Sequence, residues 1–423
     1  MNDRLADLDR RWEADPSESS RAAILRERVR LGALTEERLA LAAWLGCSPA
    51  RKAAKPEELV ALERARTERS QNAVIDDFSR SELHGALLDW ALLLPSLEFD
   101  VVSRAAVAAA RVATQAHLEL AEFESNLNAV ETFLVGRQRI EEFKKVSEWS
   151  LDHDPPYTDS REVQGAFWAL RQAHLMTSYD PRDGELPDIS SVELIEMRKQ
   201  YFDHRQELPL TLAAAVTALP SDGHEKVTDA VRSDLVPWLL GLQDPIKQRI
   251  VNREERRQRL WTVVDAARAD PRPTDSLRRQ LVTLSSTERL DLVRAYQCAI
   301  RNLDGYVSRF AAALLTGRDS EQDYRSFLAT VIGMGREVYE IMDREPDQLP
   351  DKIADNWPTE SWIEAPMSRA VVDLEAGGFV LGPWERSCLP SLSHDFSRKL
   401  NKWDGPHYVP RLYRRLGDKV DWG

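Results

Sequence analysis

The sequence predicts a mainly α-helical protein with more than one domain. Apolar residues recur at helical spacing through most of the chain, as at Leu277, Leu281 and Leu284. A chain of 423 residues is long enough for two or three domains with sizeable cores. Prolines and glycines gather between the periodic segments and near the C-terminus. We therefore expect a multi-helix N-terminal region, followed by a helical C-terminal domain with an irregular, aromatic-rich end.

The first expected element is a helical hairpin within residues 1–55. One helix covers the segment RAAILRERVRL and ends near Gly32. Thr35 has the side chain of an N-cap, and two glutamates follow it in the first turn, where negative charge favours the helix dipole. Gly46 ends this second helix.

A second helical region is expected over residues 56–177. Its segment RAAVAAARVATQAHLEL is rich in alanine, which favours helix formation and lets helices approach closely. A further helix follows at NLNAVETFLVG. This pair resembles the helix pairs of immunity proteins of polymorphic toxin systems, which implies a role in binding another protein.

Residues 178–257 are expected to hold a linker and connecting helices. The segment SYDPRDGELPDIS, residues 178–190, interrupts the helical pattern with prolines and a glycine and is the best linker candidate. Helices should follow at 192–205, at 210–219 and from Glu225, the last kinked or ended by Pro237. A basic helix at 246–259 leads into the next region.

The C-terminal domain is expected over residues 258–423. Ser285 and Glu288 have the spacing of a capping box, and Ser320 begins a later helix. Gly333 and Gly335 divide that helix from the next one. Beyond residue 350, one more helix is expected at 367–375 among irregular segments.

The motifs of this domain occur in a characteristic order. The chain reads WTVVDAAR, LRRQLVTLS, YRSFLATVI, GREVYE and, near its end, PRLYRRLGD. This order resembles a bacterial family known as domain-of-unknown-function family 4240, over residues 258–418. The resemblance implies a helical domain and brings no established activity with it.

Charge and targeting features restrict the class of protein. The net charge of −13 disfavours a general nucleic-acid binder. The most apolar run, residues 87–97, is interrupted and too short to span a membrane, and the charged N-terminus is unlike a signal peptide. Three cysteines lie far apart, which predicts neither a disulfide scaffold nor a zinc site. We expect a cytoplasmic protein that does not bind membranes.

Two His-Asp pairs invite comparison with helical metal phosphohydrolases, which need such a pair on a helix facing one metal ion. His153-Asp154 precedes two prolines, and His394-Asp395 lacks a second helical carboxylate at a useful distance. A capping aspartate beside an incidental histidine is the favoured interpretation of each pair. No phosphate-binding loop, nucleophile elbow or zinc motif occurs, so we assign no catalytic residue, no metal site and no cofactor.

Three further groups of residues have alternative interpretations. The polar residues of the C-terminal helices form either a catalytic pocket or, as we favour, surface charges and internal salt bridges; they are Asp265, Arg268, Asp291, Asp304, Arg325, Arg336 and Glu337. A basic run is either a phosphate-binding patch or, more in keeping with its mixed charges, a solvated helix face; it contains Lys247, Arg249, Arg253, Arg256, Arg257 and Arg259.

The third group is the tail, which could stack nucleic-acid bases through its aromatic and basic residues. We expect instead that Leu412, Tyr413 and Leu416 pack on the helices of residues 260–345, with Arg411, Arg414 and Arg415 pointing outward.

These observations predict a non-enzymatic helical protein-interaction module that acts in a bacterial conflict system, in toxin immunity or phage defence. Its partner is expected to be another protein. The alternative is a metal-dependent hydrolase or nuclease effector of such a system, which would use acidic residues of the C-terminal helices.

Overall fold

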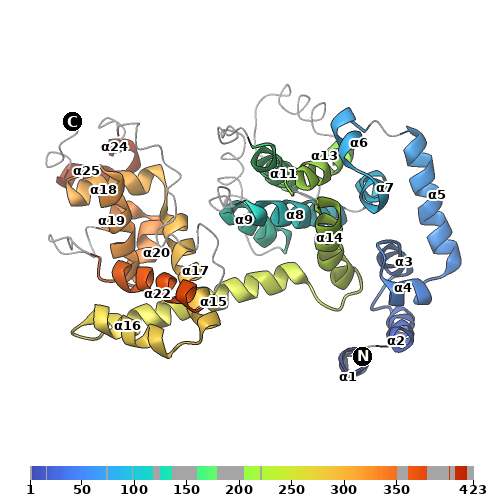
Figure 1. The fold of residues 1–423 in the computed structure, drawn as a ribbon, viewed down its shortest axis with the longest axis horizontal. Coiled ribbons are helices and arrows are strands. Elements are labelled where there is room, and N and C mark those ends of the chain that lie inside the picture. Colours follow the sequence, from blue (N-terminus) through green and yellow to red (C-terminus); the bar gives the residue numbers. More distant parts are fainter. Residues whose placement is uncertain are drawn as a thin grey trace. The chain divides into compact units, whose positions relative to one another are not determined.

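The regular structure of this protein is helical, as predicted (Figure 1). The computed structural model describes residues 2–15, 17–72, 75–97, 99–117, 124–135, 160–178, 204–219, 222–349, 361–378, 400 and 405–416. Within these ranges the chain forms α-helices and short 3-10 turns, and no strand. Within the same ranges, no helix is both long and apolar enough to cross a membrane.

The chain folds into two compact units, Met1–Ile250 and Val251–Gly423. The sequence predicted three separate regions here, at residues 1–55, 56–177 and 178–257. In the structure the first two and nearly all of the third belong to one unit, which ends at Ile250. They do so because α8 (Phe99–Ala116) packs against α13 (His204–Thr217) and α14 (Gly223–Leu239), and α3 (Glu36–Trp44) packs against α5 (Pro56–Asn72) and α14, which produces one continuous core. The linker expected at residues 178–190 lies outside the described residues except for residue 178. The helix expected at 192–205 lies outside them except for residues 204 and 205.

In the N-terminal part, α2 (Glu18–Arg30) and α3 (Glu36–Trp44) form on either side of Gly32, and both pack against α4 (Ser48–Ala53). Thr35 caps α3, and its hydroxyl accepts a hydrogen bond from the backbone N–H of Arg38 at 3.3 Å. Gly46 follows α3 with a φ of 98°, a conformation that favours glycine. The elements of this part are α1 (Asn2–Ala14), α2 (Glu18–Arg30), α3 (Glu36–Trp44), α4 (Ser48–Ala53), α5 (Pro56–Asn72), α6 (Asp77–Glu82), α7 (Gly85–Leu93) and η1 (Leu94–Ser96).

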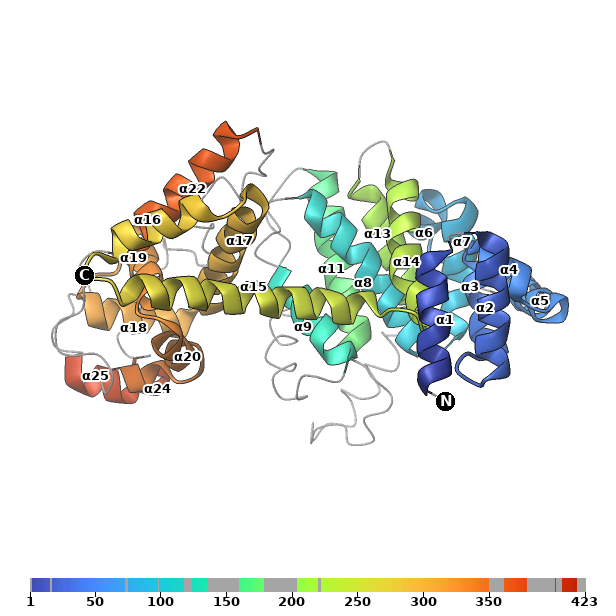
Figure 2. The ribbon, with the colours of Figure 1, turned by 90° about the horizontal axis from the view of Figure 1, so that it is seen from below.

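The centre of the first unit is a layer of helices that lie side by side in Figures 1 and 2. These are α8, α9 (Glu124–Leu134), α11 (Arg161–Ser178), α13 (His204–Thr217) and α14 (Gly223–Leu239). Small residues allow the close spacing. A Cβ atom on Gly165 of α11 would lie 2.8 Å from the carbonyl oxygen of Ala214 in α13, so these two helices can pack this closely because residue 165 is glycine. Pro237 lies in the last turn of α14, as its sequence position predicts.

The second unit contains most of α15 (Pro245–Arg268), which begins in the first unit (Figure 2). The other elements are α16 (Pro273–Thr283), α17 (Ser286–Leu303), α18 (Tyr306–Thr316), α19 (Glu321–Gly333), α20 (Arg336–Arg344), η3 (Pro346–Gln348), α22 (Glu364–Ala376), α24 (Gly405–Tyr408) and α25 (Pro410–Leu416). The predicted capping box is present, because the Ser285 hydroxyl accepts from the Glu288 N–H and the Glu288 carboxylate accepts from the Ser285 N–H. The predicted division between α19 and α20 is also confirmed, with Gly335 at a φ of 94°.

The C-terminal tail packs onto its own unit, which confirms the predicted docking. Leu412 is fully buried in the core of the second unit, and Tyr413 and Leu416 pack partly buried against the same core. The carboxylate of Asp347 in η3 accepts hydrogen bonds from the backbone N–H groups of Arg411 and Leu412 at 2.7 and 2.9 Å. Arg411 and Arg414 are exposed, as expected, and the side chain of Arg415 lies outside the described residues.

Candidate functional site

Most of the seven polar residues predicted as a possible pocket form ion pairs or hydrogen bonds with neighbouring side chains or backbone. Arg268 donates a hydrogen bond to the carbonyl of Met334 at 2.7 Å and lies 3.9 Å from Asp265, so both residues brace the turn at Gly335. Asp291 of α17 faces Arg256 of α15 at 3.7 Å. These contacts join neighbouring helices.

The remaining members of this group follow the same pattern. Arg325 pairs with Glu321 one turn earlier, and Arg336 pairs with Glu340 at 2.6 Å. Asp304 lies beside the buried Tyr324, where burial first and the carboxylate second raise the pKa of the phenol. Glu337 is exposed. None of the seven residues lines the two cavities considered below, and His153-Asp154 and His394-Asp395 lie outside the described residues.

The basic run departs from the predicted solvated face at Arg249. This side chain inserts into the first unit, where its two terminal nitrogens bind the carboxylate of Asp234 at 2.7 and 2.6 Å and its Nε binds Glu131 at 2.7 Å. Burial lowers the pKa of Arg249, but the hydrogen bonds and charges of Asp234 and Glu131 outweigh burial and raise that pKa above its ordinary value. The prediction missed this because both carboxylates come from other helices, Asp234 from the preceding one and Glu131 from 118 residues earlier in the chain.

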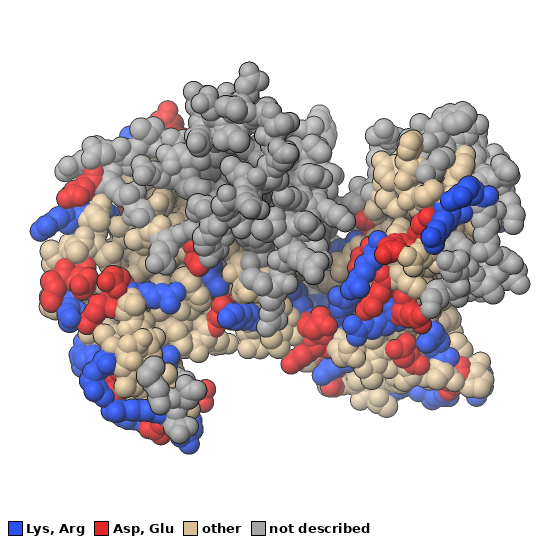
Figure 3. All heavy atoms as spheres, turned by 180° about the vertical axis from the view of Figure 1, so that it is seen from behind, with Lys and Arg blue, Asp and Glu red and all other residues tan. Residues whose placement is uncertain are grey.

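The later arginines of the run face partners within the second unit. Arg259 lies 3.4 Å from Glu288, and the guanidinium of Arg257 lies 5.6 Å from the centre of the Tyr339 ring. On the face of the molecule drawn in Figure 3, basic and acidic side chains of the described residues are interspersed. This arrangement matches the mixed charge of the sequence and contrasts with the single-sign stripe of a typical nucleic-acid interface.

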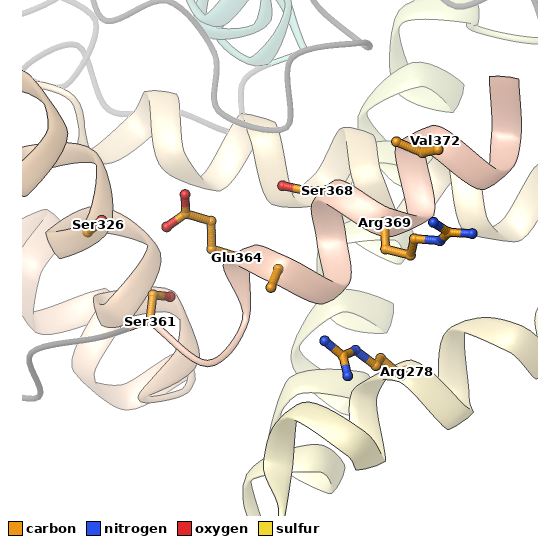
Figure 4. A pocket seen from close by; sticks show the side chains of 8 residues that line it. Arg278, Ser326, Ser361, Glu364, Ser368, Arg369 and Val372 are labelled. Carbon is orange, nitrogen blue, oxygen red and sulfur yellow. The ribbon is translucent and has the colours of Figure 1, made fainter.

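A polar cleft of about 940 Å³ lies in the second unit, bordered by α16, α19 and α22 (Figure 4). Its polar lining consists of Arg278, Ser326, Ser361, Glu364, Ser368 and Arg369. In the view of Figure 4, the carboxylate of Glu364 lies on the side of the serines, and the two guanidinium groups lie on the other side. The cleft therefore offers hydrogen-bond donors and acceptors in two separate regions.

The arginines of this cleft already have acidic neighbours on their own helices. Arg278 lies 3.7 Å from Asp275, and Arg369 lies 2.9 Å from Asp373. The arrangement suits the binding of a polar group.

An apolar groove of about 770 Å³ lies in the first unit, beneath α5. Its larger apolar side chains come from four helices and from the turn before α8; they are Leu41, Leu62, Leu97, Val101 and Leu239. Leu41, Val101 and Leu239 are buried, whereas Leu62 and Leu97 are partly exposed. Two ion pairs hold α5, one from Lys55, just before the helix, to Glu36 at 3.0 Å and one from Arg66, in the second half of the helix, to Asp89 at 2.9 Å.

Charged residues border the apolar groove. Glu37 and Glu58 line it together with Arg38, whose guanidinium lies 4.5 Å from the centre of the Trp238 ring. The carboxylate of Glu37 accepts hydrogen bonds from its own backbone N–H and from the Thr35 hydroxyl. Both lower the pKa of Glu37, so this carboxylate stays ionised at neutral pH. The groove thus combines an apolar floor with an acidic rim.

Sequence reasoning found neither the cleft nor the groove. Leu41, Val101 and Leu239 have the spacing of ordinary core residues, and their sequence pattern does not distinguish a filled core from an open groove. One signal was available at α5, where both Leu62 and the exposed Val60 interrupt a highly charged helix.

Among the comparisons with known proteins, a match was found for one part of the second unit. No curated protein and no solved structure matches the chain. Residues 256–373 match the model of a family described as a protein of unknown function (DUF4240), which confirms the resemblance over this range, whereas the PRLYRRLGD segment lies beyond it. Every residue that lines the polar cleft falls within this range, and every residue that lines the apolar groove falls before it. The second unit therefore carries a domain similar to the DUF4240 family.

Proposed function

We propose that this protein is a non-enzymatic interaction module that binds an amphipathic, basic helix of another protein in the apolar groove of its first unit. The observation that carries the proposal is the groove itself, with its apolar floor and the carboxylates of Glu37 and Glu58 at its edge. Binding of an apolar helix face in a hydrophobic groove is a common mode of peptide recognition.

The apolar floor supplies the attraction. Leu62 and Leu97 keep part of their surface open to solvent, and a partner side chain that covers them would remove this surface from water. Burial of one leucine-sized side chain contributes about 1.5–3 kcal/mol, so several partner side chains must be buried together to outweigh the loss of rotational and translational freedom, about 4–15 kcal/mol.

The acidic rim supplies the preference for a basic partner. Arg38 is the basic residue of the lining, and its guanidinium lies over Trp238, whereas the carboxylates of Glu37 and Glu58 belong to helices on two sides of the groove. Lysines or arginines that flank the apolar face of the partner would meet these carboxylates. Charge complementarity of this kind increases specificity and the association rate, and salt screens it.

The biological setting that we propose is a bacterial conflict system in the cytoplasm. It is supported by the resemblance of the segments RAAVAAARVATQAHLEL and NLNAVETFLVG to immunity-protein helices. In such a setting the partner would be a toxin or another effector that presents the basic helix.

The test uses two designed helical peptides that share a leucine stripe and differ in charge. One carries lysines beside the stripe and the other carries glutamates, and fluorescence anisotropy measures their binding to the full-length protein. We expect the lysine peptide to bind at least tenfold more tightly, with a difference that decreases as salt is added.

The location is tested with a matched pair of substitutions on α5. Leu62→Asp, inside the groove, should abolish binding, whereas Val60→Asp on the exposed side of the same helix should leave it unchanged. Equal binding of both peptides, or equal effects of both substitutions, would contradict the proposal.

A further inference from the structure

Arg38 is the cationic residue among those that line the apolar groove. It belongs to α3 and lies three residues before Leu41 of the groove floor, so the two side chains are neighbours on one face of that helix. Its side chain is half-buried. A helix that covers the apolar floor therefore passes close to this guanidinium.

The ring of Trp238 in α14 holds the guanidinium of Arg38 in place. The guanidinium lies 4.5 Å from the centre of the indole, a distance at which a cation is attracted to the ring face. A guanidinium is planar, and its N–H groups point outward in its own plane, so those groups stay free for hydrogen bonds when it stacks on a ring. The side chain thus loses little freedom when it binds a partner.

The same indole carries a second guanidinium, which shows what Arg38 lacks. Arg104 also lies 4.5 Å from the centre of the Trp238 ring. Its two terminal nitrogens donate hydrogen bonds to the two oxygens of Asp244, at 2.9 Å each. Arg104 is buried, and its charge is neutralised by this bidentate pair.

Arg38 has no such counter-ion. Among the described residues, its guanidinium forms neither an ion pair nor a side-chain hydrogen bond. The carboxylate of Glu37 is engaged elsewhere, since it accepts hydrogen bonds from its own backbone N–H and from the Thr35 hydroxyl. A helix bound in the groove would remove water from Arg38, and a charge that loses water without gaining a partner weakens binding.

We infer that the partner helix carries one acidic side chain, an aspartate or a glutamate, that pairs with Arg38. The inference rests on the proposed binding of a basic helix in this groove and adds a requirement to it. The acidic side chain accepts two parallel hydrogen bonds from the free edge of the guanidinium, in the geometry that Asp244 adopts with Arg104.

This pair fixes how the partner lies in the groove. Arg38 is held on the side of α14 by Trp238, whereas Glu58 belongs to α5. The acidic residue of the partner therefore lies toward α14, and a basic residue lies toward α5. A helix that is basic throughout would place a like charge against Arg38, so the groove selects against it.

The test starts from the lysine-flanked leucine peptide described above. At each position beside the leucine stripe in turn, one lysine is replaced by glutamate in one peptide and by the isosteric glutamine in another. Fluorescence anisotropy measures binding to the full-length protein. We expect glutamate to bind about three- to tenfold more tightly than glutamine at one position, the range for a partly exposed ion pair, and no more tightly at the others.

Substitutions of Arg38 test the assignment of that position. Arg38→Gln should abolish the preference for glutamate, and Arg38→Glu should reverse it, so that lysine there binds more tightly than glutamate. A reversal cannot arise from loss of folding. Arg51→Gln removes the same charge at an exposed site of α4 outside the groove, and this control should keep the preference.

Two kinds of failure are distinguishable. If no peptide of the series binds, the proposed function fails and the ion pair fails with it. If the lysine peptide binds but glutamate is preferred at no position, or if the preference survives in Arg38→Gln, the groove binds a basic helix and Arg38 does not select an acidic residue.

Discussion

Arg249 donates a hydrogen bond from its Nε to the carboxylate of Glu131 at 2.7 Å, although 118 residues separate the two in sequence. Glu131 has no exposed surface, and it also pairs with Arg111 at 2.9 Å. Asp234 completes the group by binding the two terminal nitrogens of Arg249. Two arginines thus balance two carboxylates in the interior of the first unit.

Arg249→Met should strongly destabilise the first unit. The substitution leaves two buried carboxylates opposite a single guanidinium, and removal of one partner from a buried ion pair costs about 3–5 kcal/mol. Chemical denaturation followed by circular dichroism measures this loss. Arg256→Met in the same helix is the control; its pair with Asp291 is 3.7 Å long and partly exposed, so it should cost less than about 1 kcal/mol. Similar losses for the two variants would contradict the buried role of Arg249.

The stack of His84 on His224 predicts a pH dependence of stability. The ring centres are 3.6 Å apart, and burial first, then the neighbouring His84, lower the pKa of His224. The unfolded chain therefore binds more protons than the folded one below the ordinary histidine pKa of about 6.5. The contribution of this residue to stability is complete above that pH and decreases as the pH falls toward the lower pKa of the folded state.

His224→Phe keeps a ring in the stack and removes its titration. The difference in melting temperature between pH 7.5 and pH 5 should become smaller in this variant than in the unmodified protein. His407→Phe, at an exposed position, is the control and should leave the difference unchanged. An unchanged difference in His224→Phe would mean that other groups cause the acid sensitivity.

The docked tail should contribute measurably to the stability of the second unit. Leu412 is fully buried, and Leu412→Ala should cost about 2–5 kcal/mol, as other leucine truncations in cores do. Arg414→Ala, on the exposed side of the same helix, should change stability by less than about 0.5 kcal/mol. Chain truncation before Lys402 should lower the melting temperature of this unit by several degrees or make it insoluble. Full retention of the melting temperature after truncation would show that the tail does not stabilise the unit.

Divalent metal ions should leave the melting temperature unchanged if the protein is an interaction module. A metal bound at a hundred times its Kd would stabilise the folded state by about 2.7 kcal/mol, which corresponds to a rise of about 5–10 °C for a unit of this size. Differential scanning fluorimetry with magnesium, manganese, zinc and EDTA measures this. Among the described residues, no group of three or more histidine, cysteine or acidic side chains could hold a metal ion. A reproducible rise with one metal would favour the hydrolase or nuclease alternative.

Local sequence was sufficient for some of the helix boundaries and for the tail, whereas α15 runs on to Arg268 and α13 spans parts of two expected helices. The Ser285–Glu288 capping box, the Thr35 cap and the division at Gly335 each depend on residues within a few positions of one another. The docking of the tail was also predictable from local sequence. Several apolar side chains lie close together around Leu412, and burial of such side chains stabilises the folded state, so the tail was expected to pack on its own domain.

Tertiary structure alone decided the ion-pair cluster, the cleft and the groove. Arg249 lies in a run of mixed charge that is typical of a solvated face, and the buried carboxylates that bind it come from α9 and α14. Likewise, the spacing of Glu37 and Leu41 predicts that they share a face of one helix, but the groove beside them requires α5, α8 and α14. Helical periodicity reports which residues share a face, whereas ion pairs and cavities depend on which distant helix packs against that face.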